Sequence, residues 1–405
     1  MQSLRECSGR AVGHLPGLLS RVACAAATTA APSQQQLQRR YAAVPDGVRA
    51  AFGYCVQQVR QYDYLNYVWV AQMDKDLRPA LFALRAFNIE TAMVADLVRS
   101  KEPVMGQIRF QWWRDAIKSA YEERAPSHPV ALALSHVLHS PGPAPVASTS
   151  APASTPGSSS TASSTAAADA DSGCADSGCS SSSPRSSMGS STSSSGSGAG
   201  GGSNSGPGRF SRYSFKRIID CREADFLDPQ PPLDMNALEQ YAEGTASQLL
   251  YLQLSAAGIK DRDADHAASH LGRAIGITTL LRGTAAHAAA RRSYLPIDMC
   301  AEARVSQEDV YSGVASEGLR DVVHQVASLA KGHLDEARRL APRLPTGTAG
   351  LMLPALGVDR YLKALEAANF DPFDAKLLRE HGGGSGAAPL TYALEIKWHQ
   401  LRGTY

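Results

Sequence analysis

The amino-acid sequence predicts an all-α protein with one large domain interrupted by a long insertion. Three observations support this fold class. Apolar residues recur at helical spacing through most of the chain, and residues that begin or end helices flank these segments. Segments that alternate apolar and polar residues, as strands do, are scarce. Residues 141–208 are almost wholly Ser, Gly, Ala, Thr and Pro, a composition typical of an insertion without a core.

Residues 1–41 have the composition of a mitochondrial transit peptide. They contain five arginines and a single acidic residue, with Ser, Thr and apolar residues that suit an amphipathic helix. The stretch RRYAA at 39–43 resembles a matrix-processing site, which favours a mitochondrial over a plastid address. A disordered tail is the alternative. No segment approaches the ~20 apolar residues of a membrane span.

The insertion at 141–208 is expected to be disordered and exposed. It contains no aromatic residue, so it has little with which to offset an ordering cost of roughly 1–2 kcal/mol per residue. We therefore expect the folded domain to comprise residues 42–140 and 209–405, roughly 300 residues, which suffice for one large core.

Two long helices are predicted before the insertion. Residues 76–98 place apolar side chains near helical spacing, with Asp76 as the N-cap and Pro79 in the first turn. Residues 103–123 open on a proline and carry the apolar repeat Val104, Ile108, Trp112, Ala116, Ile117 and Tyr121.

The two adjacent tryptophans of the second helix have two interpretations. Side chains one residue apart point about 100° apart on a helix, so at least one of Trp112 and Trp113 should lie in the core. The alternative is a membrane-interface or partner-binding patch that also includes Phe110, Arg109 and Arg114.

The chain after the insertion is also predicted to be helical. Residues 234–258 form a helix with Asp234 as cap and Gly258 as stop. Three aspartates then precede the next helix, where negative charge is favourable. They are Asp261, Asp263 and Asp265, and further helices are expected after Ser306, Glu317, Val358 and Pro389.

The helix that follows those aspartates enters a segment without acids. From His266 to Ile297 there is no Asp or Glu, and small residues at 272–279 allow neighbouring helices to approach closely. Arg282 therefore binds an anion or forms a buried ion pair with an acid of another helix. His266 and His270 have the i, i+4 spacing of a helical zinc site. His287 would be the third ligand, but it lies over 20 Å further along a straight helix at ~1.5 Å per residue, so packing roles are favoured.

Four motifs carry a family resemblance. They are FALRAFNIETAMVAD (82–96), GQIRFQWWRDAI (106–117), YAEGTASQLLYLQL (241–254) and HLGRAIGITTLLRGTAAHAAARRSYLP (270–296). In this order they resemble the squalene/phytoene synthase family, and within it the mitochondrial branch that serves the assembly of respiratory complex I. The resemblance extends from about Tyr54 to Tyr405, except for the insertion.

The resemblance implies an isoprenoid-synthase helical bundle with a degenerate metal site. Enzymes of the family hold Mg²⁺ with two Asp-rich motifs, in which residues i and i+4 share a helix face. Where the first motif has its leading aspartates stand Ala92 and Met93, and only Asp96 matches. The second motif has Gly283 and His287 in place of its acids.

Glu90 does not restore the first motif, because at six residues from Asp96 it projects from another helix face. A lone carboxylate does not build a multi-metal site. The resemblance therefore implies a pseudoenzyme with no catalytic residue, no metal and no cofactor. Arg282, Arg292, Tyr294 and Glu90 are candidates for lining a pocket or binding a partner.

The expected function is that of a non-catalytic factor for the assembly of mitochondrial complex I. It would lie peripherally on the matrix side of the inner membrane and bind complex I membrane-arm subunits, other assembly factors or a lipid. One alternative is an active prenyltransferase that takes carboxylates from Glu90 with Asp96, or from the 220–228 segment. A lipid-binding protein without a role in assembly is another.

Charge and cysteine usage narrow the functional classes further. The formal net charge of +2 gives no indication of nucleic-acid binding. The seven cysteines show no CxxC spacing, so neither a disulfide framework nor a cysteine-rich zinc site is expected.

Overall fold

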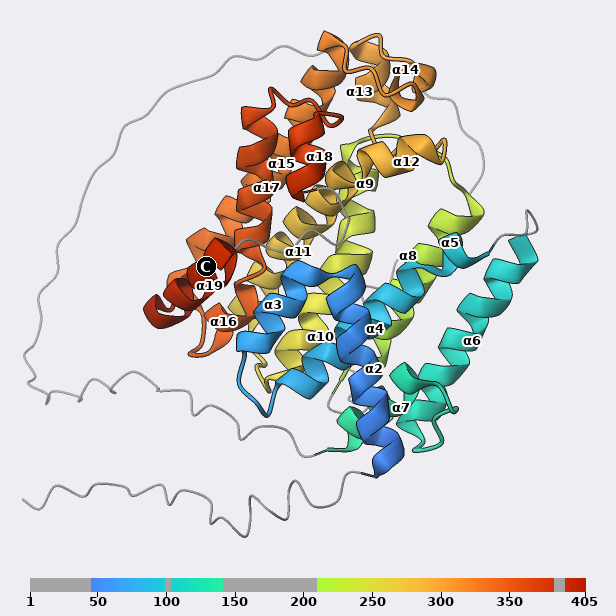
Figure 1. Cartoon of the computed structure of the whole chain (residues 1–405), viewed down its shortest axis with the longest axis vertical. Helices are drawn as coiled ribbons and strands as arrows, with labels where there is room; N and C mark the ends of the chain where they lie inside the picture. Colours follow the sequence, from blue (N-terminus) through green and yellow to red (C-terminus); the bar gives the residue numbers. More distant parts are fainter. Residues whose placement is uncertain (1–44, 99–102, 141–209, 382–389) are drawn as a thin grey trace, which may run out of the picture. The chain divides into compact units, whose positions relative to one another are not determined.

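The computed structural model describes residues 45–98, 103–140, 210–381 and 390–405. These residues form helices and no strand, which confirms the all-α prediction (Figure 1). The predicted leader at 1–41 and the predicted insertion at 141–208 lie outside the described residues. In chain order the elements are α2 (Asp46–Tyr62), α3 (Tyr64–Gln72), α4 (Arg78–Ala92), α5 (Val94–Leu97), α6 (Pro103–Tyr121), α7 (Pro129–His139), α8 (Arg212–Leu227), α9 (Met235–Ala242), the π-helical turn η1 (Glu243–Ser247), α10 (Gln248–Ala256), α11 (Arg262–Arg282), α12 (Thr284–Ala289), α13 (Ile297–Glu302), α14 (Gln307–Tyr311), α15 (Glu317–Leu340), the 3₁₀ turn η2 (Ala341–Arg343), α16 (Thr348–Met352), α17 (Ala355–Ala367), α18 (Ala375–His381) and α19 (Leu390–Arg402).

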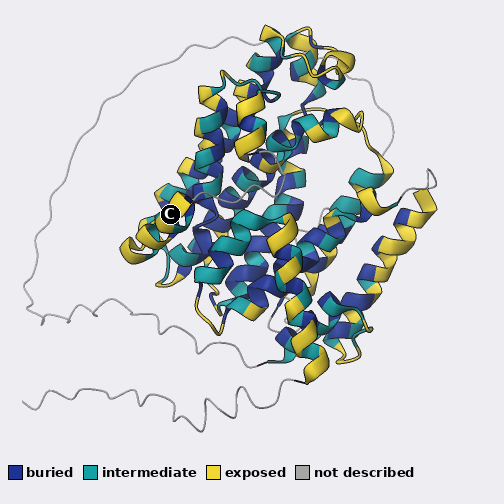
Figure 2. Cartoon of the chain, in the orientation of Figure 1, coloured by how far each residue is buried: buried dark blue, intermediate teal, exposed yellow. Residues whose placement is uncertain are grey.

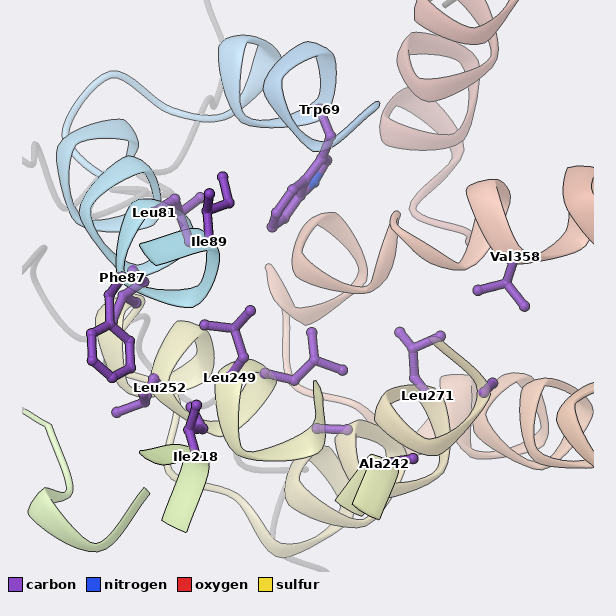
Figure 3. Close-up of a cluster of buried hydrophobic side chains, with 14 of the residues drawn as sticks. Trp69, Leu81, Phe87, Ile89, Ile218, Ala242, Leu249, Leu252, Leu271 and Val358 are labelled. Carbon is purple, nitrogen blue, oxygen red and sulfur yellow. The ribbon is translucent and has the colours of Figure 1, made fainter. Parts of the chain in front are cut away.

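The core is organised around α11. This helix packs against α15, α9, η1, α10 and α17, while α10 also contacts α4 and α8. Buried residues occupy the faces that these helices turn toward one another (Figure 2). Figure 3 shows side chains of α3, α4, α10 and α11 meeting in this core, among them Trp69, Phe87, Leu249 and Leu271. The extensive burial of α4, from Ala80 to Phe87 without interruption, explains why its apolar residues are not confined to one stripe.

Several predicted helix boundaries are confirmed by side-chain caps. Asp234 accepts a hydrogen bond from the backbone N–H of Ala237 at 2.7 Å, and Asp261 accepts one from Ala264 at 2.8 Å. Ser306 forms a reciprocal capping box at the start of α14. Gly258 has a φ of 76° and ends α10, as glycine does at helix C-termini.

The predicted helix 234–258 contains a π-helical turn that its apolar spacing does not reveal. This turn, η1, joins α9 to α10 without a break. Neighbouring backbones approach it closely, because a Cβ on Gly272 of α11 would lie 2.3 Å from the Cα of Ser247. Such turns occur often at functional sites.

The predicted helix 76–98 is wrong at both ends. Asp76 lies in a turn, and α4 begins only at Arg78, whose Nε donates to the carbonyl of Met73 at 2.7 Å. The helix ends at Ala92, and a separate short helix, α5, follows Met93. At this end the Thr91 hydroxyl donates to the carbonyl of Phe87 at 2.8 Å, a backbone contact that often bends helices.

The apolar repeat predicted for 103–123 is only partly buried. Ala116 and Ile117 lie in the core, but Val104, Ile108 and Trp112 are exposed. The buried face runs instead through Gly106, Phe110 and Trp113. Gly106 is required there, because a Cβ would lie 2.1 Å from the ring of Phe226 on α8. One tryptophan is thus in the core, as the 100° spacing requires, and its neighbour faces outward.

Within the described ranges, no helix has the length and apolarity that crossing a bilayer requires.

Candidate functional site

A cavity of about 610 Å³ lies among the helices that carry the four motifs. Its walls come from α2, α3, α4, α5, α6, α8, α9, η1, α10, α11 and α12, so residues far apart in the sequence share it. Small side chains form much of the wall on one side, including Thr245, Ala246 and Gly276. A Cβ on Gly276 would lie 2.6 Å from that of Ala242, so α11 and α9 are in close contact behind this wall.

The three positions of the first motif all line the cavity. Ala92 ends α4, Met93 forms the break, and Asp96 lies on α5. Because the helix breaks between them, positions 92 and 96 do not share the face of one continuous helix. Asp96 is exposed, and no carboxylate stands at either of the other two positions.

The second motif lies across the cavity, where α11 meets α12. His287 lines the cavity, and its ring lies over Gly283, where an added Cβ would be 2.5 Å from the His287 Cε1. The same ring packs edge-on against Tyr294, with centroids 4.7 Å apart. Burial, with a smaller contribution from the Arg292 charge, lowers the pKa of His287 to about 4. His287 is therefore a neutral side chain at neutral pH, and it occupies the space above position 283.

Asp225 of α8 is a cavity residue that the motif comparison did not single out. It lies in the 220–228 segment, and it accepts hydrogen bonds from Arg292 at 2.9 Å and from the Tyr294 hydroxyl at 2.8 Å. Burial raises the pKa of this carboxyl, and the Arg292 guanidinium opposes the shift. Its sequence signal is weak, since it is one of several acids in a helix whose partners lie 67 and 69 residues away.

Four arginines and three aspartates line the cavity, with no lysine or glutamate. Arg85 faces Asp63 at 3.6 Å, and Arg292 pairs with Asp225. Arg222 donates to the backbone carbonyl of Asn88 at 2.5 Å and to its side-chain Oδ1 at 2.7 Å. Two of the three carboxylates thus already face an arginine.

Arg282 and Arg222 differ from Arg85 and Arg292, because neither forms an ion pair among the described residues. Among the described residues, no carboxylate lies within ion-pair distance of the Arg282 guanidinium, although it lies near the Tyr361 hydroxyl and lowers the pKa of that tyrosine against the larger effect of burial. The sequence left two options for Arg282, an anion site or a buried ion pair. Within the described part of the chain Arg282 forms no ion pair, and the anion site stays a prediction.

Glu90 lies outside the cavity. It projects from α4 toward α2, where its carboxylate accepts a hydrogen bond from the Tyr54 hydroxyl at 2.6 Å. A position six residues from Asp96 on a helix does point elsewhere, and the break at Met93 separates the two further. Of the other predicted site residues, Ala92, Met93, Asp96, Arg282, His287, Arg292 and Tyr294 line the cavity, and Gly283 lies directly behind the His287 ring.

The two histidines with zinc-like spacing lie elsewhere on α11. His270 contacts His266 through their Nε2 atoms at 3.2 Å, and its Nδ1 contacts the Nδ1 of His333 at 2.9 Å. The Nε2 of His333 in turn forms a hydrogen bond with the Glu239 carboxylate at 2.7 Å. His287 is not part of this chain of hydrogen bonds. No group of three or more His, Cys, Asp or Glu side chains within the described ranges is arranged to hold a metal ion.

Known proteins are similar to this chain over the segments that form the helical bundle. A family model described as squalene/phytoene synthase matches residues 59–148 and 208–381. The chain is 31% identical over 328 residues to NADH dehydrogenase (ubiquinone) complex I, assembly factor 6 of Bos taurus, which covers 81% of this chain and 78% of that protein. It is also 31% identical over 350 residues to the protein of the same name from Rattus norvegicus, with 84% of each chain covered.

Solved structures show the same fold. The crystal structure of a dehydrosqualene synthase in complex with ligand superposes with a TM-score of 0.59 at 16% identity, covering 88% of this chain and 99% of that one. The match places the described helices in the bundle of that synthase and so confirms the architecture that the four motifs implied. By sequence and by fold, this chain belongs to the squalene/phytoene synthase family.

Proposed function

We propose that this protein is a non-catalytic assembly factor for mitochondrial respiratory complex I, built on a synthase bundle that no longer holds magnesium. The relatives that match most of the chain carry the name of a complex I assembly factor, which supports the biological role. The composition of residues 1–41 supports a mitochondrial address. The protein acts on the matrix side of the inner membrane as a peripheral component.

The charge of the cavity is the observation that carries the pseudoenzyme part of the proposal. Magnesium requires near-octahedral oxygen ligands, and the diphosphate chemistry of the family requires several such ions. The residues around the cavity do not fit that requirement. Asp96 has no carboxylate beside it in its motif, and Asp225 is bound to Arg292 and Tyr294.

A restored acid at position 283 would also meet the His287 ring, since even a Cβ there lies 2.5 Å from it. The His287 ring therefore fits only when position 283 has no side chain. A single reversion at Gly283 does not rebuild the motif.

The cavity is proposed to bind an apolar group directly, without a metal bridge. Its volume of about 610 Å³ falls in the range of small-molecule sites. A lipid chain or an apolar helix of a nascent membrane-arm subunit would occupy it. Arg282 supplies a positive charge for an anionic head group or a partner carboxylate.

Disruption of the gene tests the biological role. Assembled complex I should be depleted while the other respiratory complexes are spared. Normal complex I in such cells rejects the assignment.

Complementation of the disrupted cells tests the cavity itself. Ala286 and Ala289 are both exposed residues of α12, but only Ala286 lines the cavity. We expect Ala286→Trp to fail to restore complex I, because its ring fills the cavity, and Ala289→Trp to restore it. Equal rescue by both variants contradicts a role for the cavity.

Catalysis is tested on the purified protein. Incubation with farnesyl or geranylgeranyl diphosphate and Mg²⁺ should release no diphosphate and form no joined hydrocarbon. The alternative function, an active prenyltransferase, is favoured by the presence of both Asp96 and Asp225 at the cavity. Product formation that is lost in Asp96→Asn and Asp225→Asn establishes that alternative instead.

A further inference from the structure

Helix α19 carries apolar side chains on its outer side. Leu390, Leu394, Trp398 and Leu401 have exposed fractions of 54% to 86%. At 100° per residue, all four fall within about 80° of the helix circumference. We call them the α19 stripe. Isolated exposed apolar residues are normal on protein surfaces, but a continuous stripe on one helix indicates a binding surface.

The opposite side of α19 is firmly attached to the bundle. Tyr392 and Ile396 are buried in the core, and Glu395 pairs with Arg360 of α17 at 3.0 Å. The side chain of Gln400 donates to the carbonyl of Gln72 on α3 at 3.3 Å. The helix is therefore apolar on both sides, and packing within the described residues accounts for only one of them. In Figure 2 the outer edge of α19 is exposed.

Positive charge flanks the α19 stripe on both sides. Lys397 lies about 20° beyond Leu390, and Arg402 lies about 40° beyond Trp398. The Arg402 guanidinium is 4.1 Å from the centroid of the Trp398 ring. Glu395 is the only acid of α19, and its charge is matched by Arg360. The surface thus combines leucines, a tryptophan and cations, which is the composition of a helix that lies in the interface of an anionic membrane.

A second exposed stripe, on α6, differs from the α19 stripe because an acidic residue lies within it. Val104, Ile108 and Trp112 point outward, but the exposed Asp115 lies on the same line of the helix, one turn from Trp112 and two turns from Ile108. Its carboxylate is paired only with the amide of Gln111. Negative charge inside the stripe opposes an anionic lipid surface, so α6 does not fit the same partner.

We propose that the α19 stripe binds the surface of an anionic phospholipid bilayer, with Trp398 at the level of the head groups and Lys397 and Arg402 in contact with lipid phosphates. This inference rests on the peripheral membrane association proposed above and names the surface responsible. Three leucines enter the boundary of the acyl chains, while Tyr392 and Ile396 hold the helix to the bundle.

Tryptophan quenching in the full chain provides the test. The protein contains four tryptophans, of which Trp69 and Trp113 are buried and Trp112 lies on the α6 stripe. Vesicles of phosphatidylcholine and phosphatidylglycerol with brominated acyl chains should quench the emission. The quenching should be lost in Trp398→Phe and retained in Trp112→Phe. Because residues 1–41 contain no tryptophan, vesicle binding by that segment does not give this signal.

Cosedimentation with the same vesicles measures the strength of binding. The double variant Leu394→Glu with Leu401→Glu should lower the partition coefficient about tenfold or more. In this variant two charges replace apolar side chains that enter the bilayer when the protein binds. The matched control changes Leu233 and Val314, which are also exposed but lie apart from α19, to Glu and should bind as the unmodified chain does. Lys397→Glu with Arg402→Glu, at sites away from the core, should reduce binding to the anionic vesicles and the response to salt.

Other results overturn the inference. Quenching that survives in Trp398→Phe places the contact elsewhere, and quenching lost only in Trp112→Phe assigns it to α6. A dimer in sedimentation equilibrium that the two Leu→Glu changes dissociate assigns the stripe to a second copy. Failure of the vesicle test leaves the complex I phenotype untouched, so the two proposals fail separately.

Discussion

The polar groups at the two ends of α11 differ in whether they have protein partners. In the N-terminal half, the polar groups that face the bundle have protein partners. Glu243 of η1 accepts hydrogen bonds from Tyr251 at 2.7 Å, Ser269 at 2.8 Å and Arg273 at 3.1 Å. At the C-terminal end, Arg282 faces the cavity without a carboxylate partner among the described residues.

This difference separates structural charge from charge available to a ligand. Burial alone acts to raise the pKa of Glu243, but the hydrogen bonds from Tyr251 and Ser269 outweigh it and hold the pKa below its ordinary value. A carboxylate so fully engaged stabilises the bundle and has no capacity left for a ligand. An arginine that lines a cavity without such partners contributes little to the bundle and can bind an anion.

The largest expected effect is on the N-terminal half. Glu243→Leu leaves Arg273, Tyr251 and Ser269 without their acceptor, so we expect unfolding to become easier by about 2–4 kcal/mol. This range allows for the partial exposure of the Glu243–Arg273 pair. Urea unfolding measures the change. The control Glu243→Gln keeps an acceptor and should cost less, and a loss below about 0.5 kcal/mol in Glu243→Leu removes the contrast between the two ends.

The next effect concerns the pH dependence of stability at the cavity. His287 has a folded pKa of about 4, below the ordinary value near 6.5. The unfolded chain therefore binds more protons between these values, and the free energy of unfolding falls as the pH drops from about 6.5 to about 4. The loss is roughly 1–3 kcal/mol, at ~1.4 kcal/mol per pKa unit.

Denaturant unfolding at several pH values compares the chain with His287→Gln. The variant should show a shallower dependence over this window, while the contributions of other histidines remain. Parallel curves for the two proteins contradict the buried, neutral state of His287.

A smaller effect is expected at Gly283. Its φ of −79° is compatible with any residue, so Gly283→Ala brings no backbone strain. The new Cβ nevertheless meets the His287 ring at 2.5 Å, and we expect a loss of about 1–2 kcal/mol. In a His287→Ala background the same change should cost nothing or stabilise. A thermodynamic cycle over the four proteins measures this coupling, and additivity of the two changes disproves the steric contact.

The smallest effect on stability is expected at Arg282. Arg282→Ala should alter the free energy of unfolding by no more than about 0.5 kcal/mol, because the side chain forms no ion pair with any of the described residues. It should instead reduce any anionic lipid that copurifies with the protein, measured by mass spectrometry of the extract. Arg292→Ala serves as the contrast, since it strips Asp225 of its partner and should destabilise the fold.

Much of the fold could be predicted from local sequence signals. Asp234 caps its helix and Gly258 ends one as predicted, and helices begin after Asp261 and Ser306 as predicted, because caps depend on neighbouring residues alone. Prediction was less successful where long-range contacts decide. The stripe on α6 faces outward, and the opposite side of the helix packs through Gly106 against Phe226 of α8, a long-range contact that the apolar spacing does not reveal.

The candidate site shows the same division. The motif positions 92, 93, 96, 283 and 287 could be named from the sequence because they stand at fixed spacings within two segments. Asp225 was considered only as part of an acidic segment, because its partners Arg292 and Tyr294 are distant in the chain. The hydrogen bonds that link His270 to His333, on α15, were not predicted for the same reason.

The sequence by itself determined the helical class of the fold, the family, and which side chains stand at the positions compared with the Asp-rich motifs, since these depend on composition and local spacing. Only the tertiary structure decided which charges are already matched. A carboxylate or a guanidinium acquires its role from neighbours brought together by the packing of separate helices. For that reason three features emerge only in the folded chain: the engaged charge of Asp225 and, as far as the described residues show, the unpaired charge of Arg282 and the exposed stripe of α19.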